Sequence, residues 1–272
     1  MIKVLLIILV VFTTISCNRH LLTESEFKSK KVYVNIAEAL ESPKDVYSLN
    51  LHMPDSLPKD ILKLKRLNEL DVFKPKFNSL PKFIGRFQNL QTLIILEANL
   101  KSIPSEICEL KKLKWLRIWN SKLIELPSKI NKLKNLETLE LFANDIRQLP
   151  RSITKLKRLK EIGIDSNHNL DFYDSFNKLA QLPKLTCLNI NYYPLDTLPS
   201  NIIALKNLQI ITLWNNSGGK LDIEDMIEKL SKLQKLEKLD LSGNPVDEKS
   251  KMRYVEALKK QHDKCEVIWN SY

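Results

Sequence analysis

The stretch from residue 126 to residue 148, LPSKINKLKNLETLELFANDIRQ, decides the fold of this 272-residue chain. The leucines on either side of Glu140 alternate with it, and this two-residue period predicts a short strand with one face turned inward. Ile130, Leu133 and Leu136 recur at every third residue, which predicts a tight helical turn that buries one edge. Neither the strand nor the turn can cover its own apolar edge, so this unit needs a copy of itself on each side.

Such copies fill most of the chain. Units open 23 residues apart at Leu57-Pro58, Leu80-Pro81, Ile103-Pro104, Leu126-Pro127 and Leu149-Pro150, and another opens at Leu198-Pro199 after one irregular unit. Stacking them predicts a curved solenoid with a parallel sheet on its concave side and short helical or 3-10 turns on its convex side. We predict nine strands, whose first inward-facing residues are Leu49, Leu70, Leu93, Leu116, Leu139, Ile162, Leu188, Ile211 and Leu239.

The repeated pattern L-P-x-x-I-x-x-L-x-x-L-x-x-L-x-L-x-x-N-x-I resembles the leucine-rich-repeat family from about Val46 to Trp269. The resemblance implies an α/β horseshoe solenoid that binds a ligand on its concave face. An asparagine in the turn after the strand is expected to bond exposed backbone groups. It is present at Asn144, Asn167, Asn216 and Asn244, whereas Pro75, Ala98, Ser121 and Tyr193 replace it in other units and make those turns less certain.

Two units break the period. Ile162 and Leu188 are 26 residues apart, and Ile211 and Leu239 are 28 apart. In the second, residues 215–219 (NNSGG) predict a loop, and Asp222 predicts the N-cap of a helix with Ile223, Ile227 and Leu230 on one face. The insertion is interpreted either as a convex side that became a true helix or as a loop at the rim of a binding surface.

The chain divides into five predicted segments: a signal peptide (1–16), a lipidated tether (17–32), an N-terminal cap (33–45), the repeats (46–246) and a C-terminal cap (247–272). The N-terminal cap contains a short predicted helix at Val34 to Leu40. The C-terminal cap contains an amphipathic helix from Asp247 to His262, with Met252, Val255 and Leu258 inward, and then a strand-like run from Cys265 to Trp269.

The first residues indicate export. Val4 to Ile15 is an apolar run shorter than the roughly 20 residues that a membrane-spanning helix needs, so it suits a secretory signal. Thr14-Ile15-Ser16-Cys17 resembles the lipobox of bacterial lipoproteins, which implies lipidation of Cys17, although Thr14 stands where that family prefers an aliphatic residue. The alternative is an ordinary signal peptide cleaved after Ser16. By the same resemblance, Asn18 points to the outer membrane, if the organism has two.

The other three cysteines, Cys108, Cys187 and Cys265, are an odd number at wide spacing. Strands stack about 4.8 Å apart, so Cys108 and Cys187 would lie on the order of 15 Å apart, too far for a disulfide. We expect three buried thiols and no metal site.

The predicted strand register places a set of side chains on the concave face. Phe73, Leu96, Trp119 and Phe142 share one column on four consecutive units, which makes an apolar strip of a kind that marks binding surfaces. The alternative is a strip covered by long neighbours or stabilising the sheet through cross-strand pairs. The predicted ligand-binding residues are Phe73, Ile94, Leu96, Trp115, Arg117, Trp119, Glu140, Phe142, Asp165 and Trp214.

Charge separates by face. The three concave columns hold two bases (Arg117, Lys238) against six acids (Glu69, Asp71, Glu140, Glu161, Asp165, Asp240), a formal charge of −4, in a chain of formal charge +11. The positive excess lies largely in convex turns such as Lys65-Arg66 and Lys111-Lys112. These bases are interpreted as a solvated face, with an anionic membrane or polysaccharide as the alternative partner. Nucleic acid is not an expected partner, since the bases lack interleaved aromatic residues.

No enzyme motif is present: neither a phosphate-binding loop nor a nucleophile elbow, and the four histidines are scattered. Asp165 and Glu140 are expected to lie close together, but an open sheet should leave their pKa values near normal. We therefore predict a cell-surface protein that binds a protein ligand without catalysis and without a cofactor. A carbohydrate-binding lipoprotein, with tryptophans stacked on sugar rings, and an envelope-structural protein are the alternatives.

Overall fold

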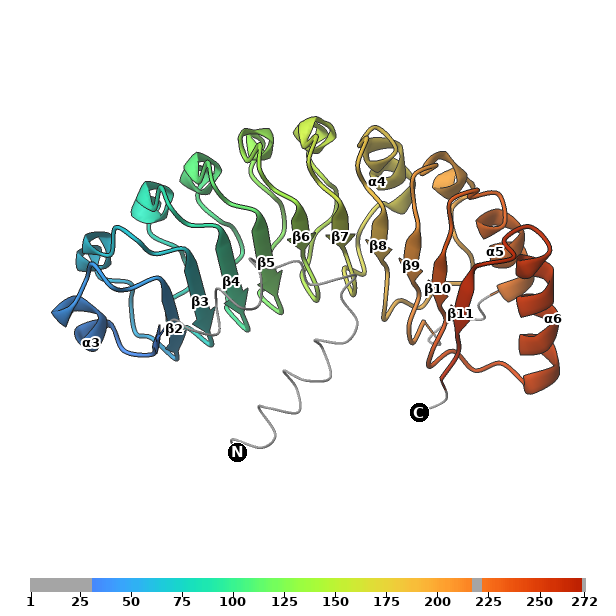
Figure 1. Cartoon of the computed structure of the whole chain (residues 1–272), viewed down its shortest axis with the longest axis horizontal. Coiled ribbons are helices and arrows are strands. Elements are labelled where there is room, and N and C mark those ends of the chain that lie inside the picture. Colours follow the sequence, from blue (N-terminus) through green and yellow to red (C-terminus); the bar gives the residue numbers. More distant parts are fainter. Residues whose placement is uncertain (1–30, 217–221, 271–272) are drawn as a thin grey trace. The chain divides into compact units, whose positions relative to one another are not determined.

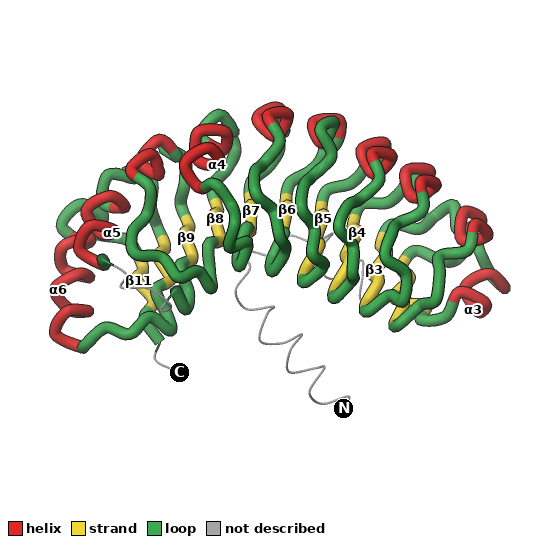
Figure 2. The backbone as a smooth tube through the Cα atoms, turned by 180° about the vertical axis from the view of Figure 1, so that it is seen from behind, coloured by secondary structure: helices red, strands yellow, loops and turns green. Residues whose placement is uncertain are grey.

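The computed structural model describes residues 31–216 and 222–270. Residues 31–272 form one compact unit, in which eleven strands make a single parallel sheet with the strands in chain order. In this unit the strands line the inner side of an arc and the helical turns line its outer side (Figures 1 and 2). The predicted signal peptide and the lipidation site Cys17 lie outside the described residues.

The elements follow the chain with little interruption. The strands are β1 (Val32–Tyr33), β2 (Ser48–His52), β3 (Glu69–Phe73), β4 (Thr92–Leu96), β5 (Trp115–Trp119), β6 (Thr138–Glu140), β7 (Glu161–Gly163), β8 (Cys187–Asn189), β9 (Ile210–Thr212), β10 (Lys238–Asp240) and β11 (Glu266–Ile268). The α-helices are α3 (Ile36–Glu41), α4 (Phe172–Leu179), α5 (Ile223–Leu230) and α6 (Glu248–Lys259). The 3-10 helices are η1 (Lys59–Lys63), η2 (Lys82–Arg86), η3 (Ser105–Glu109), η4 (Ile130–Lys132), η5 (Arg151–Lys155) and η6 (Ser200–Ala204).

The predicted strand register is confirmed. Leu49 pairs with Leu70, and the pairing continues through the other seven predicted inward positions to Leu239. All nine side chains are fully buried, and burying a leucine or isoleucine contributes about 1.5–3 kcal/mol. The buried edge of each unit therefore fixes which side chains face the concave surface.

The convex turns owe their shape to the Leu-Pro opening. A proline directly precedes the helix in η1, η2, η3, η5 and η6. The fixed φ of proline suits the start of a helix. Ile61 donates its backbone N–H to the carbonyl of Pro58 (3.1 Å), and Leu64 donates to Ile61 (3.0 Å). These bonds span three residues, so every third side chain points to one edge and enters the core.

The turn after each strand from β2 to β10 carries a residue with positive φ, which is strained for any residue but glycine. Eight units use a residue other than glycine there, such as Ala143 (φ 51°) and Tyr192 (φ 59°), and the last uses Gly243 (φ 73°). Each donates its N–H to the next unit: Ala143 to the carbonyl of Asp165 (2.9 Å) and Tyr192 to that of Trp214 (2.9 Å). The strained turn thereby ties neighbouring units together at the rim of the concave face.

A ladder of buried asparagines supports the same turns. Asn144 accepts the backbone N–H groups of Ser121 (3.2 Å) and Leu123 (3.1 Å), and its amide donates to the carbonyl of Ile118 (2.7 Å). Asn167, Asn216 and Asn244 make equivalent bonds.

Tyr193 takes the asparagine's role in its own unit. Its hydroxyl accepts the N–H of Asn167 (2.8 Å) and donates to the carbonyl of Ile164. The Tyr193 hydroxyl therefore links this unit to the one before it, as the asparagines do elsewhere, although with two bonds where Asn144 makes five.

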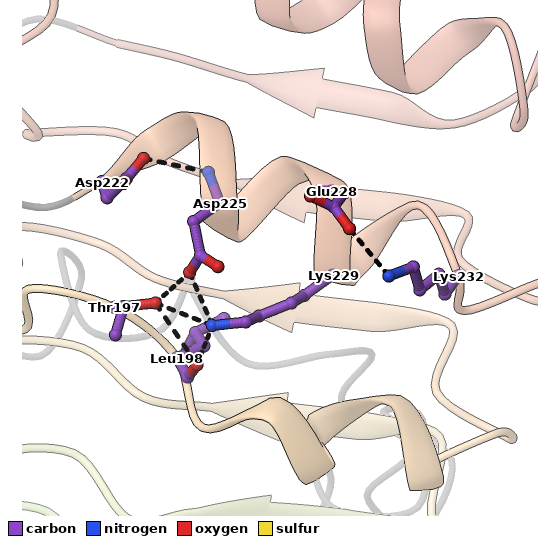
Figure 3. Close-up of polar contacts among 7 residues, drawn as sticks. All are labelled: Thr197, Leu198, Asp222, Asp225, Glu228, Lys229 and Lys232. Carbon is purple, nitrogen blue, oxygen red and sulfur yellow. Dashed lines mark hydrogen bonds and ion pairs between the residues drawn. The ribbon is translucent and has the colours of Figure 1, made fainter.

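Both irregular units place a true helix on the convex side, which confirms the first interpretation of the insertion for α5. Asp222 caps α5 as predicted, accepting the N–H of Asp225 (2.9 Å). Lys229 pairs with Asp225 (2.6 Å) and donates to the carbonyl of Leu198 (2.6 Å) in the preceding Leu-Pro corner (Figure 3). Part of the predicted 215–219 loop lies outside the described residues.

We did not predict α4, yet it repeats the device of α5. Asp171 caps it by accepting the N–H of Asp174 (2.9 Å), and Lys178 pairs with Asp174 and donates to the carbonyl of Leu149 (2.6 Å). The spacing Asp-x-x-Asp-x-x-x-Lys is the same in both helices. Each longer unit is thus anchored to the Leu-Pro corner before it.

The caps differ in detail from the prediction. The sheet begins one residue inside the predicted tether, at Val32 in β1. The predicted helix at 34–40 is α3, and the predicted final strand is β11. In α6, however, the predicted inward face is wrong in part, because Met252 is 65% exposed and only Leu258 is buried.

Cys108 and Cys265 are buried free thiols, as expected. The same expectation for Cys187 is wrong, because this residue is disulfide-bonded. The sequence argument against a bond among Cys108, Cys187 and Cys265 stands, since Cys108 and Cys265 are both free thiols.

Candidate functional site

The concave face carries all ten predicted ligand-binding residues, because the confirmed register fixes their columns. Phe73, Leu96 and Trp119 are consecutive partners at the ends of β3, β4 and β5. Most members of the set are partly exposed. Three are buried, with exposed fractions of 9% for Trp115, 4% for Glu140 and 8% for Asp165. The predicted strip is therefore a partly covered surface, with the smallest exposed fractions in its central strands.

Four aromatic rings form a continuous row along one rim of this face. The ring centroids of Trp119 and Phe142 are 5.6 Å apart, those of Phe142 and Tyr192 are 5.8 Å apart, and those of Tyr192 and Trp214 are 5.3 Å apart. We call Trp119, Phe142, Tyr192 and Trp214 the aromatic row. These distances fall within the range in which aromatic pairs attract one another, so the rings hold each other in place.

Sequence reasoning missed Tyr192. It lies one position after the third concave column, in the strained turn, and its positive φ directs it back into the row. The sequence did contain a signal: Tyr192 is an aromatic residue that directly follows Asn191, the third-column residue of its unit.

Arg117 occupies the middle of the face. Its guanidinium carbon lies 4.3 Å from the ring centroid of Trp119 and 5.3 Å from that of Trp115, within reach of a cation–π interaction. It also forms an ion pair with Glu140. Arg117 therefore orders one end of the aromatic row and neutralises one of the concave carboxylates.

Three carboxylates gather beside the aromatic row, and we call Glu140, Glu161 and Asp165 the acidic cluster. They surround Gly163, which has no side chain to separate them. A Cβ built on Gly163 would lie 3.1 Å from Asp165 Oδ2 and 3.7 Å from the Cγ of Glu140. Glu161 joins through Asn189, whose amide nitrogen lies 3.7 Å from the same point and donates to Glu161 Oε1 (3.1 Å).

Asp165 is the acid of this cluster that lies in the same column as the aromatic row. Its Oδ1 accepts the backbone N–H of Asn191 (2.7 Å), and the side chain of Asn191 in turn accepts the N–H of Trp214 (2.7 Å). Over the described ranges, 31–216 and 222–270, Asp165 forms no ion pair. The buried carboxyl group of Asp165 is thus held in a fixed position, and no cation of the described residues pairs with it.

Burial raises the pKa values of two concave acids, Asp165 and Asp71, and for Asp165 this is contrary to our expectation. It raises the pKa of Asp165 to about 7, and the charge of Glu140 adds to the effect. It raises the pKa of Asp71 to about 8, with a further contribution from Glu69 and an opposing one from Arg117. The expectation failed because it assumed a sheet open to water, whereas side chains of neighbouring units cover Asp165 and leave it 8% exposed. Such shifts mark functional sites but also occur at structural ones.

Some of the convex bases link neighbouring units through asparagine side chains. Asn89 donates to the carbonyl of Lys65 (2.7 Å) and accepts Lys112 Nζ from the next unit (2.7 Å). Asn135 repeats this arrangement by donating to Lys111 (2.7 Å) and accepting Arg158 (2.7 Å). These contacts give the bases a structural role between units.

Among the residues that the structure describes, no group of three or more His, Cys, Asp or Glu side chains is arranged to hold a metal ion. No helix in that part of the chain is long and apolar enough to cross a membrane.

Comparison with known proteins agrees with this geometry. The family model described as "Leucine-rich repeat region" matches residues 104–190. The leucine-rich-repeat domain of the type III effector XopL is similar over 86% of this chain and 79% of its own, with 24% identity and a TM-score of 0.60. An internalin (InlF) from Listeria monocytogenes is similar over 86% of this chain and 76% of its own, with 19% identity and a TM-score of 0.49.

A leucine-rich-repeat protein of Leptospira interrogans matches over 88% of this chain and 99% of its own, with 21% identity and a TM-score of 0.29. The search among curated proteins gives no match. The eleven-stranded parallel sheet with its helical turns is a leucine-rich-repeat solenoid. The matching family model supports a place in the leucine-rich-repeat family, whose fold commonly serves protein–protein interaction.

Proposed function

We propose that this chain is a non-catalytic protein-binding protein that holds its partner on the concave face. The aromatic row carries this proposal, because four rings spaced 5.3 to 5.8 Å apart form one preorganised surface. Tryptophan and tyrosine dominate the binding energy of protein interfaces. Rings that are already ordered lose little conformational entropy on binding.

Photo-crosslinking in the producing cells tests this proposal. A photoreactive phenylalanine analogue replaces Phe142 in the aromatic row, and in a second version it replaces Tyr173, which is 59% exposed on convex helix α4. We expect a discrete protein adduct from position 142 and none from position 173. An adduct of the same mass from both positions, or from position 173 alone, would contradict the proposal.

A carbohydrate ligand is the second candidate. The specific observation in its favour is that polar Asp165 and Asn191 share a column with Trp214, and that Asn191 accepts the backbone N–H of Trp214. Sugars stack on aromatic rings while they bond such polar groups. Titration with envelope glycans, followed by tryptophan fluorescence, separates the two candidates. Saturable quenching that is lost in Trp214→Ala would favour the glycan, and its absence would leave the protein partner.

We also propose that the chain is exported and anchored through lipid on Cys17, at the surface or in the outer membrane, which requires that the Cys17 sulfur takes part in no disulfide in the anchored protein. The apolar run at 4–15 and the lipobox-like residues 14–17 support this. Labelling cells with a fatty-acid analogue tests it. Wild type should carry the label and Cys17→Ser should not, whereas an unlabelled wild type would favour an ordinary cleaved signal peptide.

A further inference from the structure

A second surface of the solenoid lies where each convex turn leads back into the sheet. There every unit has the pattern L-x-x-L, with Phe87 in place of the first leucine in one unit, and the outer residues enter the core. Over the eight units from Leu64 to Leu236, the sixteen middle positions hold ten bases and no acid. All ten are exposed, and we call them the basic ladder: Lys65, Arg66, Lys111, Lys112, Lys134, Lys157, Arg158, Lys184, Lys206 and Lys235.

The basic ladder contains almost all of the excess charge of the chain. Ten bases without an acid give it a formal charge of +10, and the whole chain has +11. A random draw of ten charged residues from a chain with 43 bases and 32 acids would include several acids. Attraction of bases to the end of the preceding helix does not explain their absence, because the last residue of η3 is itself an acid, Glu109. The exclusion of acids is therefore a property of this surface.

Asparagines fix the position of three of these bases without removing their charge. Each asparagine lies in the unit before its base, and its amide donates to a backbone carbonyl one unit further back. Its side-chain oxygen accepts the base. The pairs are Lys112 with Asn89 (2.7 Å), Arg158 with Asn135 (2.7 Å) and Lys235 with Asn207 (2.8 Å). A carboxylate in the place of the amide would neutralise the base, so these cations are ordered and still charged.

The charge of the basic ladder is almost entirely unpaired. Within residues 31–216 and 222–270, Lys111 is the only member of the ladder in an ion pair, with Glu109 (3.0 Å). Stacking of the units needs a donor to each asparagine but not a charge, since a neutral amide or hydroxyl can also donate. Unpaired like charges in neighbouring units repel one another, and a ligand of opposite charge would relieve this repulsion.

We propose that the basic ladder binds a linear acidic polysaccharide, whose carboxylate or sulfate groups contact successive units along the arc (Figure 1). The ladder is at most two side chains wide and eight units long. Each unit adds about 4.8 Å at the sheet, so the ladder spans at least about 34 Å. A chain molecule can follow it with its charged groups separated by neutral sugar units. The basic ladder is separate from the concave face, so this binding is a function beyond the one proposed above.

Other anionic partners fit this surface less well. Single-stranded nucleic acid binds by stacking its bases on aromatic side chains, and none of the sixteen positions is aromatic. Elements that lie on a membrane combine bases with inserted apolar side chains, and Pro183 is the only apolar residue at these positions. A small anion would contact one unit and leave the other cations unpaired. A polysaccharide needs neither stacking nor insertion and extends over several units.

The test measures binding of the full chain to an immobilised heparin dodecasaccharide, which carries both sulfate and carboxylate groups. The ladder variant removes the three ordered charges: Lys112→Gln, Arg158→Gln and Lys235→Gln. The matched control removes three charges from exposed side chains outside the ladder: Lys44→Gln, Lys101→Gln and Lys249→Gln. The two variants have the same net charge, and circular dichroism first verifies that both are folded.

We expect wild type to bind the dodecasaccharide and the ladder variant to bind it at least about tenfold more weakly, because three ion pairs are lost. The control should stay within about twofold of wild type. A heparin disaccharide should bind far more weakly than the dodecasaccharide, since it cannot contact several units together. The affinity for the dodecasaccharide should also fall with added salt, and less steeply for the ladder variant.

Equal affinities of the ladder variant and the control, or no binding by wild type at low salt, would overturn the inference. A disaccharide that binds as tightly as the dodecasaccharide would also overturn it, by indicating a site for a single anion. Phosphatidylserine vesicles or single-stranded DNA might replace the polysaccharide as a probe: tighter binding of either one than of the dodecasaccharide, lost in the ladder variant, would identify a membrane or a nucleic acid as the partner instead. None of these results involves the aromatic row, so the proposed function is tested separately.

Discussion

Replacing Tyr193 by phenylalanine removes one buried hydroxyl and changes little else. That hydroxyl is the acceptor for the backbone N–H of Asn167 at 2.8 Å, and it donates to the carbonyl of Ile164. Without it, the carbonyl of Ile164 retains the side-chain amide of Asn167 at 2.9 Å, whereas the N–H of Asn167 loses its acceptor. The cost is therefore that of one buried unsatisfied donor, about 1–3 kcal/mol.

Equilibrium unfolding in urea measures this cost. The Tyr193→Phe variant should have a lower midpoint urea concentration, and its unfolding free energy should depend on urea as steeply as that of wild type. Tyr173→Phe is the control, because its side chain is 59% exposed on α4, and it should change stability by less than about 0.5 kcal/mol. Amide hydrogen exchange should also accelerate at Asn167. Equal midpoints for the Tyr193 and Tyr173 variants, with unchanged exchange at Asn167, would refute the claim that this tyrosine replaces the ladder asparagine.

Three further predictions concern pH and packing. Burial raises the pKa of Asp71 to about 8, so its contribution to stability is complete below pH about 4, the ordinary aspartate range, and is lost as pH rises through 8. Asp71→Asn should therefore raise the thermal midpoint at pH 9 but not at pH 4, and an equal effect at both would disprove the shift. A Cβ on Gly85 would lie 2.2 Å from the carbonyl oxygen of Glu106, so Gly85→Ala must separate two units and should cost about 1–3 kcal/mol in urea unfolding; no loss would mean that the units are not packed this closely. Lys229→Met removes the charged donor to Leu198 and should cost about 1–2 kcal/mol, and a change below about 0.5 kcal/mol would show that the anchor of α5 is unimportant.

The strand register was predictable because it depends on one property that every unit repeats. In each strand the first inward-facing residue, from Leu49 to Leu239, is apolar and must be buried. A shift of one residue would expose every inward leucine from Leu49 to Leu239 and bury the polar residues beside them. No other register buries the apolar residues of every unit in the same column. The concave columns followed directly, and with them the positions of Trp119, Phe142 and Asp165.

The remaining features depend on contacts between units that no single unit encodes. Tyr192 joins the aromatic row only because its strained turn brings it beside Phe142, 50 residues earlier in the chain. The raised pKa of Asp165 follows from the neighbours that cover it. Helix α4 did have a local signal, since Asp171 begins the same Asp-x-x-Asp-x-x-x-Lys spacing that starts at Asp222.

The central claim is that binding energy resides in the aromatic row of the concave face. The most direct measurement is the dissociation constant of the protein recovered by crosslinking through position 142, for wild type, Trp214→Ala and Tyr173→Ala. We predict that Trp214→Ala weakens binding by about thirtyfold or more, since a hot-spot tryptophan contributes about 2 kcal/mol, and that Tyr173→Ala leaves it within about twofold. Equal affinities for wild type and Trp214→Ala, or a larger loss in Tyr173→Ala, would contradict the account.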